Sequence, residues 1–121
     1  MANPFVHVEL QTTDLKKARD FYAKLFDWKL EDAQIPGFGT YTMIGVGEGT
    51  GGGMMASPAP GAPSYWLTYV DVSDLASATR KAKDLGAKVL VDSMAVADMG
   101  KFSVITDPTG ATIGLWQSNR K

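Results

Sequence analysis

The sequence contains no cysteine, which excludes disulfides, thiolate catalysis and cysteine-ligated metals. Histidine is almost as scarce, since His7 is the only one. The chain also lacks an excess of positive charge: 12 lysines and arginines face 13 acidic residues, with a formal net charge of -1. Because nucleic acids and anionic membranes are bound by clustered positive charge, we expect neither as a partner.

Long apolar runs are absent as well, so no segment is predicted to span a bilayer. The first ten residues show no basic segment followed by an apolar run, so we expect no secretory signal and a cytoplasmic location. What is present is ordinary for a globular domain, with 45% hydrophobic and 21% charged residues. A chain of 121 residues is predicted to form one compact domain with a substantial core.

Residues 5–28 organise the rest of the chain. They begin with an alternating strand, which Asp14 ends by capping a helix. We expect Asp27 to stop this helix, because Asp tolerates left-handed backbone. One strand face is apolar, and the other carries His7, Glu9 and Gln11. The buried helical stripe comprises Leu15, Ala18, Phe21, Tyr22 and Leu25.

A glycine-rich segment lies between two predicted strands, residues 40–46 and 52–56. Six glycines fall between Gly45 and Gly53. A phosphate-binding loop would need a following Gly-Lys-Ser/Thr and a helix, and neither is present, so the segment predicts a hairpin. A further strand is expected at 28–32, followed by a loop at 34–39.

The second half of the chain repeats the first. Asp74-Leu75-x-x-Ala78 matches Asp14-Leu15-x-x-Ala18 at an offset of 60 residues, and Gly86 is placed to end the second helix. The pattern predicts an α+β fold of two βαβββ modules, at about 5–56 and 64–118, joined by a linker at 57–63. The two should form a curved mixed sheet with a concave groove and outer helices. Four strands are expected in the second module: 64–72, 87–91, 100–106 and 111–117.

Four pieces of sequence resemble the vicinal oxygen chelate superfamily of glyoxalases, bleomycin-resistance proteins and extradiol dioxygenases. They are HVELQTTDLKKARDFYAKLF, the strand end around Tyr69-Val70-Asp71-Val72, the helix exit Leu85-Gly86-Ala87, and TDPTGATIGLWQ. The last is most similar to a glyoxalase-related subgroup of mostly unassigned chemistry. The resemblance covers residues 5–118 and implies a homodimer or tandem arrangement with a small-molecule cleft.

The resemblance also implies four metal-ligand positions, of which this chain keeps one. His7 matches the first, while Tyr65 and Gly114 stand at the third and fourth, and residues 51–56 offer no ligand for the second. A catalytic divalent site normally needs three protein ligands. We therefore predict no metal site and no cofactor, although a divalent metal is not excluded.

Two roles stay open for the strand face that carries His7, Glu9 and Gln11. His7 and Glu9 could transfer protons, or they could be ordinary hydrogen-bonded and surface residues. Trp116 beside Gly114 offers a flat wall for a planar ligand, or it fills the groove itself. The predicted ligand-binding residues are His7, Glu9, Gln11, Met54, Tyr65, Tyr69, Phe102 and Trp116.

Three functions from different classes fit these residues. We favour a protein that binds a small, partly aromatic or apolar molecule in the groove without a catalytic metal. The alternative is an enzyme: a glyoxalase-type lyase or isomerase using His7 and Glu9, or a metal-dependent dioxygenase-like enzyme with unrecognised ligands. The third is a dimeric scaffold with no small-molecule ligand.

Overall fold

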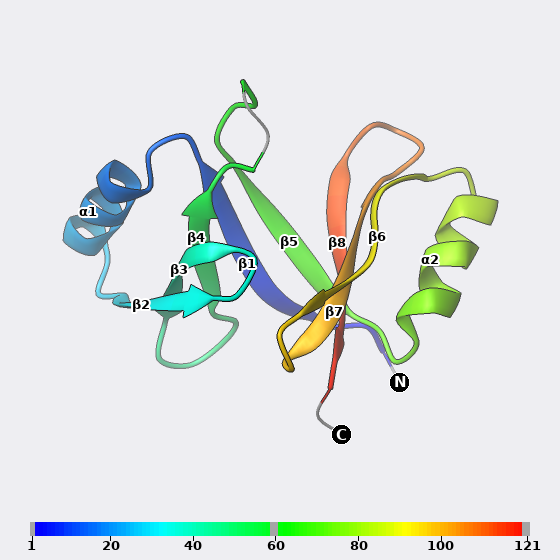
Figure 1. The fold of residues 1–121 in the computed structure, drawn as a ribbon, viewed down its shortest axis with the longest axis horizontal. Helices are drawn as coiled ribbons and strands as arrows, with labels where there is room; N and C mark the ends of the chain where they lie inside the picture. Colours follow the sequence, from blue (N-terminus) through cyan, green and yellow to red (C-terminus); the bar gives the residue numbers. More distant parts are fainter. Residues whose placement is uncertain (1, 59–60, 120–121) are drawn as a thin grey trace. The chain divides into compact units, whose positions relative to one another are not determined.

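The computed structural model describes residues 2–58 and 61–119, which form eight strands and two helices. The chain divides into two compact units, residues 7–67 in one and residues up to 6 with those from 68 onwards in the other. Neither described helix is long and apolar enough to cross a membrane. Figure 1 labels the helices and strands.

The first module runs strand, helix, strand, strand, strand, with its strands in the order β2-β3-β4-β1. β1 pairs with β4 in parallel, whereas β2–β3 and β3–β4 are antiparallel. The register places Gly53 opposite both Glu9 and Met43. The elements are β1 (Phe5–Thr12), α1 (Leu15–Leu25), β2 (Lys29–Ile35), β3 (Gly39–Gly45) and β4 (Gly52–Ala56).

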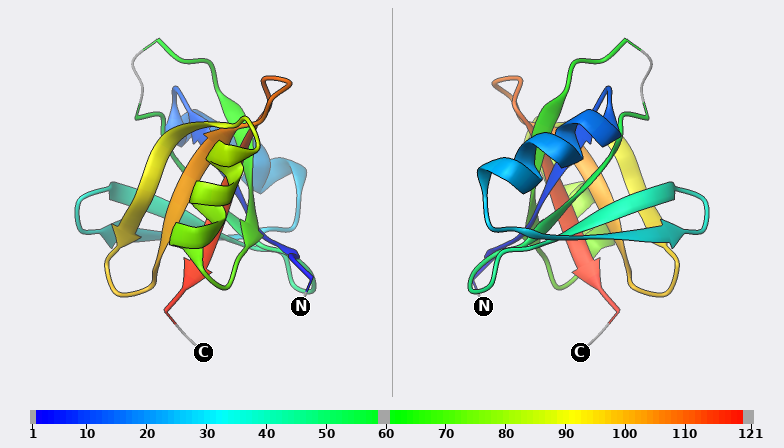
Figure 2. Two further views of the ribbon diagram at one scale, coloured as in Figure 1. Left: turned by 90° about the vertical axis from the view of Figure 1, so that its right-hand side faces the viewer. Right: turned by 90° about the vertical axis from the view of Figure 1, so that its left-hand side faces the viewer.

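The second module repeats this element order, with its strands in the order β5-β8-β7-β6 and β5 parallel to β8. The predicted α+β class and the two βαβββ modules are thus confirmed. In the left view of Figure 2, α2 crosses in front of the strands of its own module. The elements are β5 (Tyr65–Asp71), α2 (Leu75–Asp84), β6 (Lys88–Val96), β7 (Gly100–Thr106) and β8 (Thr112–Ser118).

Three of the four predicted helix ends are confirmed. The backbone N–H of Lys17 donates to Asp14 Oδ1 at 3.0 Å, and the equivalent bond to Asp74 Oδ1 is 3.1 Å. Gly86, at φ +104°, ends α2. The prediction for Asp27 was wrong: α1 ends at Leu25, where Phe26 in extended backbone donates to the Tyr22 carbonyl and closes the last turn.

Two strands are longer than predicted. β2 continues to Ile35 because its antiparallel ladder with β3 extends to the Ile35–Gly39 pair, which confines the turn to residues 36–38. β6 continues to Val96, with register shifts and a positive φ at Ser93. Side-chain periodicity could not reveal either extension, since backbone pairing with a neighbouring strand decides it.

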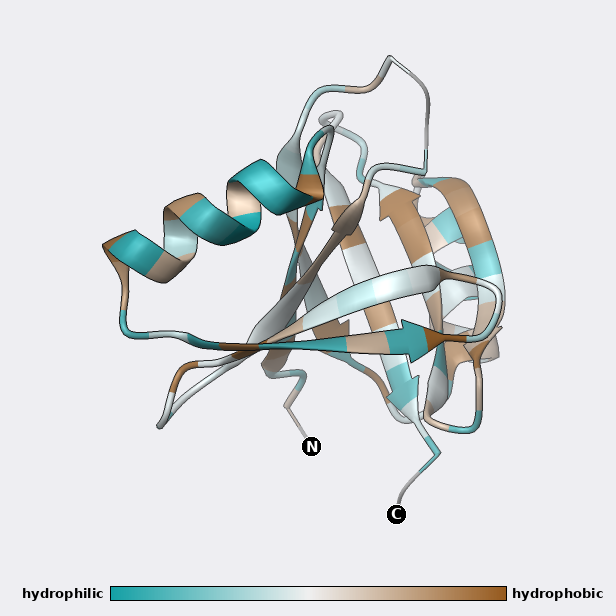
Figure 3. Ribbon diagram, turned by 60° about the vertical axis from the view of Figure 1, so that its left-hand side comes forward, coloured by the Kyte–Doolittle hydropathy of each residue, from teal (hydrophilic) through white to brown (hydrophobic). Residues whose placement is uncertain are grey.

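The core of the first module lies between α1 and the sheet. Leu10, Ile44 and Met54 are buried there, and Met54 is completely inaccessible to solvent. α1 itself contributes no fully buried residue, whereas α2 buries Leu75 and Thr79. Figure 3 shows hydrophobic and hydrophilic residues alternating along α1. The first helix is therefore only partly packed.

Two methionines on neighbouring strands allow a matched test of this core. Met54→Ala should lower the free energy of unfolding by about 2–5 kcal/mol, because it removes a fully buried side chain and leaves a cavity. Met43 is 42% exposed, and Met43→Ala should change it by less than about 0.5 kcal/mol. Urea unfolding followed by circular dichroism measures both, and equal losses would contradict this position of the core.

Candidate functional site

His7, Glu9 and Gln11 share one face of β1, and the structure adds Tyr41 from β3 to them. The Tyr41 hydroxyl lies 2.6 Å from His7 Nε2 and donates to Glu9 Oε1 at 2.9 Å. Gln11 Nε2 donates to the other Glu9 oxygen, also at 2.9 Å. Glu9 is only 7% exposed, so its carboxylate is held in a largely dry hydrogen-bonded network.

Tyr41 can reach Glu9 because β4, which lies between β3 and β1, carries glycine at the crossing point. A Cβ on Gly53 would lie 2.1–2.2 Å from the Tyr41 ring and hydroxyl, closer than any real contact. The ring therefore occupies the space that a side chain at position 53 would fill. Gly53 falls in the segment where the resemblance expected a second metal ligand.

The order of protons along this network follows from the single hydroxyl proton of Tyr41. Since Tyr41 donates to Glu9, its oxygen accepts from His7, which places a proton on His7 Nε2. The Nε2 lone pair is then not available to a metal. The geometry thus gives a directed chain from His7 through Tyr41 to Glu9.

Two pKa shifts characterise this face. Burial lowers the pKa of His7, and the negative charge of Glu9 offsets part of that shift. Burial raises the pKa of Tyr65, and the charge of Glu9 raises it further. At neutral pH His7 is therefore biased toward its uncharged form, and Tyr65 keeps its proton and remains a hydrogen-bond donor.

The residues do not fit a divalent metal of the kind that the family resemblance implies. In the described part of the chain, no group of three His, Cys, Asp or Glu side chains could hold an ion. No buried side-chain polar atom in that part lacks a hydrogen-bond partner. The donors that a metal would need are thus engaged with one another in the chain from His7 to Glu9.

The second module carries Tyr69 and Phe102 at the positions equivalent to Glu9 and Tyr41, with Trp116 beside them. Tyr69 lies opposite Gly114, and its ring meets the Phe102 ring edge to face at 6.1 Å. A Cβ on Gly114 would lie 2.4 Å from the Tyr69 ring, just as one on Gly53 would strike Tyr41. Trp116 pairs with Phe102 across β7 and β8, and its ring passes over the backbone of Gly100.

Tyr41 is the site residue that sequence reasoning missed. The repeat could have found it, because Gly39-Thr40-Tyr41-Thr42 matches Gly100-Lys101-Phe102-Ser103 at an offset of 61 residues. Phe102 was predicted to contact a ligand, and Tyr41 is its counterpart in the first module. Applying the repeat to the strands as well as the helices would have pointed to Tyr41.

Met54 lies away from these residues. It packs with Leu10 and Ile44 in the core beneath α1, and its register partner on β1 is Leu10 rather than His7 or Glu9. Because alternate residues of a strand point to opposite faces, Met54 is on the helix-covered face. We therefore leave Met54 out of the proposed ligand site.

The charge of Glu9 can be tested through the single histidine. Glu9→Gln removes the negative charge that raises the pKa of His7, so this pKa should fall further below the native value. Titration of the His7 ring protons by NMR measures the shift without overlap from other histidines. The exposed Glu31→Gln is the control and should leave the titration unchanged; a rise in Glu9→Gln would contradict the geometry.

The Glyoxalase/Bleomycin resistance protein/Dioxygenase superfamily matches residues 5–115 of this chain. "Putative glyoxylase CFP32" of Mycobacterium tuberculosis is 39% identical over 117 residues, covering 93% of this chain and 45% of the relative. Anthracycline biosynthesis protein DnrV of Streptomyces peucetius is 26% identical over 127 residues, covering 90% and 45%. The chain thus spans about half the length of the curated relatives it matches.

Solved structures share the fold at low sequence identity. Hypothetical protein BH1468 from Bacillus halodurans superposes with a TM-score of 0.76 at 14% identity, covering 100% of this chain and 98% of the other. Methylmalonyl-CoA epimerase from Mycobacterium tuberculosis gives a TM-score of 0.69 at 17% identity, covering 94% and 87%. Because the superfamily match spans residues 5–115, the chain belongs to the glyoxalase/bleomycin resistance protein/dioxygenase superfamily.

Proposed function

We propose that this protein binds a small, partly aromatic or apolar molecule at the face of β1 that carries His7 and Glu9, without a catalytic metal. The observation that supports this most is the Tyr41 hydroxyl placed between His7 Nε2 and Glu9 Oε1. It engages the imidazole nitrogen and the carboxylate in a hydrogen-bonded network. A preorganised network of this kind orients polar groups toward a ligand without a metal ion.

The polar groups of this face suit an uncharged or weakly polar ligand. His7 is biased toward its neutral form, and Tyr65 keeps its phenolic proton. Gln11 is fixed by its bond to Glu9. The Tyr65 phenol and the second amide hydrogen of Gln11 can donate to carbonyl and hydroxyl oxygens, so a ligand with such oxygens on an aromatic or apolar frame fits best.

We also propose that aromatic residues of the second module contact the ligand. Phe102 and Trp116 are partly exposed and supply aromatic surface that suits the apolar part of a ligand, whereas Tyr69 is only 5% exposed and lies against Phe102. That they contact the same molecule as His7 and Glu9 stays a prediction. The homodimer is likewise a proposal; Phe21 and Leu25 on α1 leave more than half of their surface exposed and offer apolar area for one.

A glyoxalase-type lyase or isomerase is the second candidate, favoured by the buried carboxylate of Glu9. Such chemistry removes a proton next to a carbonyl and stabilises the oxyanion that results. Glu9 would accept the proton, His7 would assist the transfer, and the protonated Tyr65 would donate to the oxyanion. The relative named "Putative glyoxylase CFP32" makes this reaction class the one to assay.

The proposed binding function is tested with two glycines on neighbouring strands. A panel of small aromatic carbonyl and hydroxy compounds is screened by saturation-transfer NMR, and the hits are titrated. Gly53→Ala should weaken binding about tenfold or more, because its Cβ displaces Tyr41 from Glu9. Gly45→Ala is the control, since its Cβ meets ordinary contacts at 3.6 Å and beyond.

The outcomes separate the two candidates. A panel without hits, or hits that bind both glycine variants equally, would contradict binding at this face. Turnover of the methylglyoxal–glutathione adduct above background, lost in Glu9→Gln and kept in Glu31→Gln, would favour the glyoxalase-type enzyme over the binding protein. Circular dichroism of each variant establishes that the fold is retained.

A further inference from the structure

An open cavity of about 360 Å³ lies within residues 7–67, beside α1. Four aromatic residues line it, Tyr22, Phe26, Trp28 and Trp66, together with Val8 and Ile44 from the sheet. Val8 alternates with His7 and Glu9 along β1, so the cavity is on the other face of the strand. It is therefore separate from the candidate functional site.

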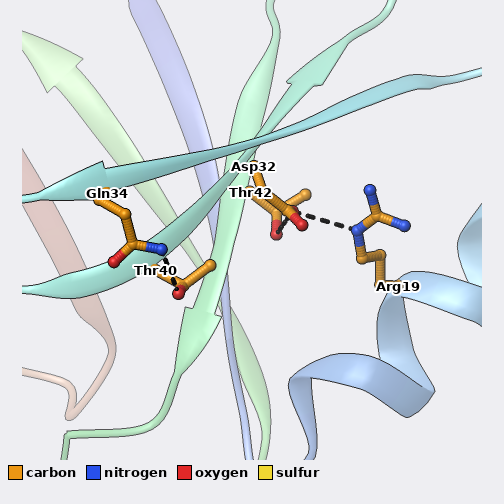
Figure 4. A network of polar contacts seen from close by, with 5 residues as sticks. All are labelled: Arg19, Asp32, Gln34, Thr40 and Thr42. Atoms are coloured by element: carbon orange, nitrogen blue, oxygen red, sulfur yellow. Dashed lines mark hydrogen bonds and ion pairs between the residues drawn. The ribbon is translucent and has the colours of Figure 1, made fainter.

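One polar link joins α1 to the sheet through an intervening side chain. Arg19 Nε donates to Asp32 Oδ1 at 3.1 Å, and Thr42 Oγ1 donates to the same oxygen at 2.7 Å (Figure 4). In the second module the equivalent residues, Thr79 and Ser103, join helix to strand directly, with their hydroxyls 2.8 Å apart. The link between helix and sheet therefore differs between the two modules.

The four aromatic rings that line the cavity contact one another and form a wall. Phe26 and Trp28 lie 4.8 Å apart, while Trp66 meets Tyr22 and Trp28 edge to face at 5.5 and 6.2 Å. Phe26 is 43% exposed and Trp66 38% exposed, so much aromatic surface still faces solvent. A flat ring laid against this wall would gain stacking and cover apolar area.

The chemistry of the lining defines the ligand further. Among the described residues, no charged side chain lines this cavity, so an ionic group placed there would lose hydration without a partner. The hollow beside α2, of about 380 Å³, differs in having Asp74 and Lys81 in its lining and no aromatic side chain from residues 2–58 or 61–119. Aromatic lining is thus a property of the first module's cavity and not of the repeat.

We propose that the α1 cavity is a second ligand site, which takes an uncharged molecule with two aromatic rings set at an angle. Its volume is within the range of small-molecule pockets, and two such rings match Trp28 and Trp66, whose ring planes meet at 75°. The site does not depend on the proposed function, because none of its lining residues belongs to the His7–Tyr41–Glu9 network.

The experiment titrates the whole protein with N-phenyl-1-naphthylamine, an uncharged fluorescent probe with a naphthalene and a phenyl ring. Saturable binding is expected, and Trp66→Ala should weaken it about tenfold or more because one wall is lost. Phe5→Ala is the control: Phe5 is a 63% exposed aromatic residue on β1 that does not line the cavity, and its replacement should leave the affinity unchanged.

A second measurement on the unaltered protein holds even if Trp66→Ala does not fold. The indole N–H signals of Trp28 and Trp66 should shift on adding the probe, while that of Trp116, which is outside the lining, should stay in place. Absence of saturable binding would overturn the proposal. So would equal shifts of all three tryptophans, or equal weakening by Phe5→Ala and Trp66→Ala, because either indicates nonspecific adsorption.

Discussion

The hydroxyl of Tyr41 is the group on which the character of the site depends. It accepts from His7 and donates to Glu9 within 2.9 Å, and so joins the polar residues of β1 into one network. Without this hydroxyl, Glu9 would keep only the bond from Gln11 among the bonds described above. A carboxylate that is only 7% exposed needs such donors, because an unsatisfied buried charge is costly.

A glycine makes that network possible, and in each module an aromatic ring lies in the space beside a strand glycine. Gly53 lets the Tyr41 ring cross β4, and Gly114 lets the Tyr69 ring lie against β8. The two modules then differ in chemistry at equivalent positions. Glu9 and Tyr41 of the first module correspond to Tyr69 and Phe102 of the second. A duplicated scaffold thus presents a polar set and an aromatic set.

Sequence predicted the features that depend on short-range chemistry. The caps at Asp14 and Asp74 and the end of α2 at Gly86 each need only neighbouring residues, and each is confirmed. The extension of β2 depended on pairing with β3, which periodicity does not contain. The α+β class and the repeated module order followed because both halves carry the same local signals.

The site was only partly accessible to the same reasoning. His7, Glu9 and Gln11 could be grouped because they alternate along one strand. Tyr41 joins them only through the register of three strands and the absence of a side chain at Gly53. The cavity beside α1 was equally hidden, since its lining combines residues of α1, the sheet and Trp66 that are far apart in the sequence.

The central proposal is that hydrogen bonds among His7, Tyr41 and Glu9 take the place of the metal centre that the family resemblance implies around His7. Metal analysis of the untagged protein, after incubation with Zn²⁺, Ni²⁺, Mn²⁺ or Fe²⁺ and desalting, tests it most directly. The account predicts that no metal is retained. Retention of about one metal per chain or per dimer, lost in His7→Ala, would contradict it and show that further ligands complete a site around His7.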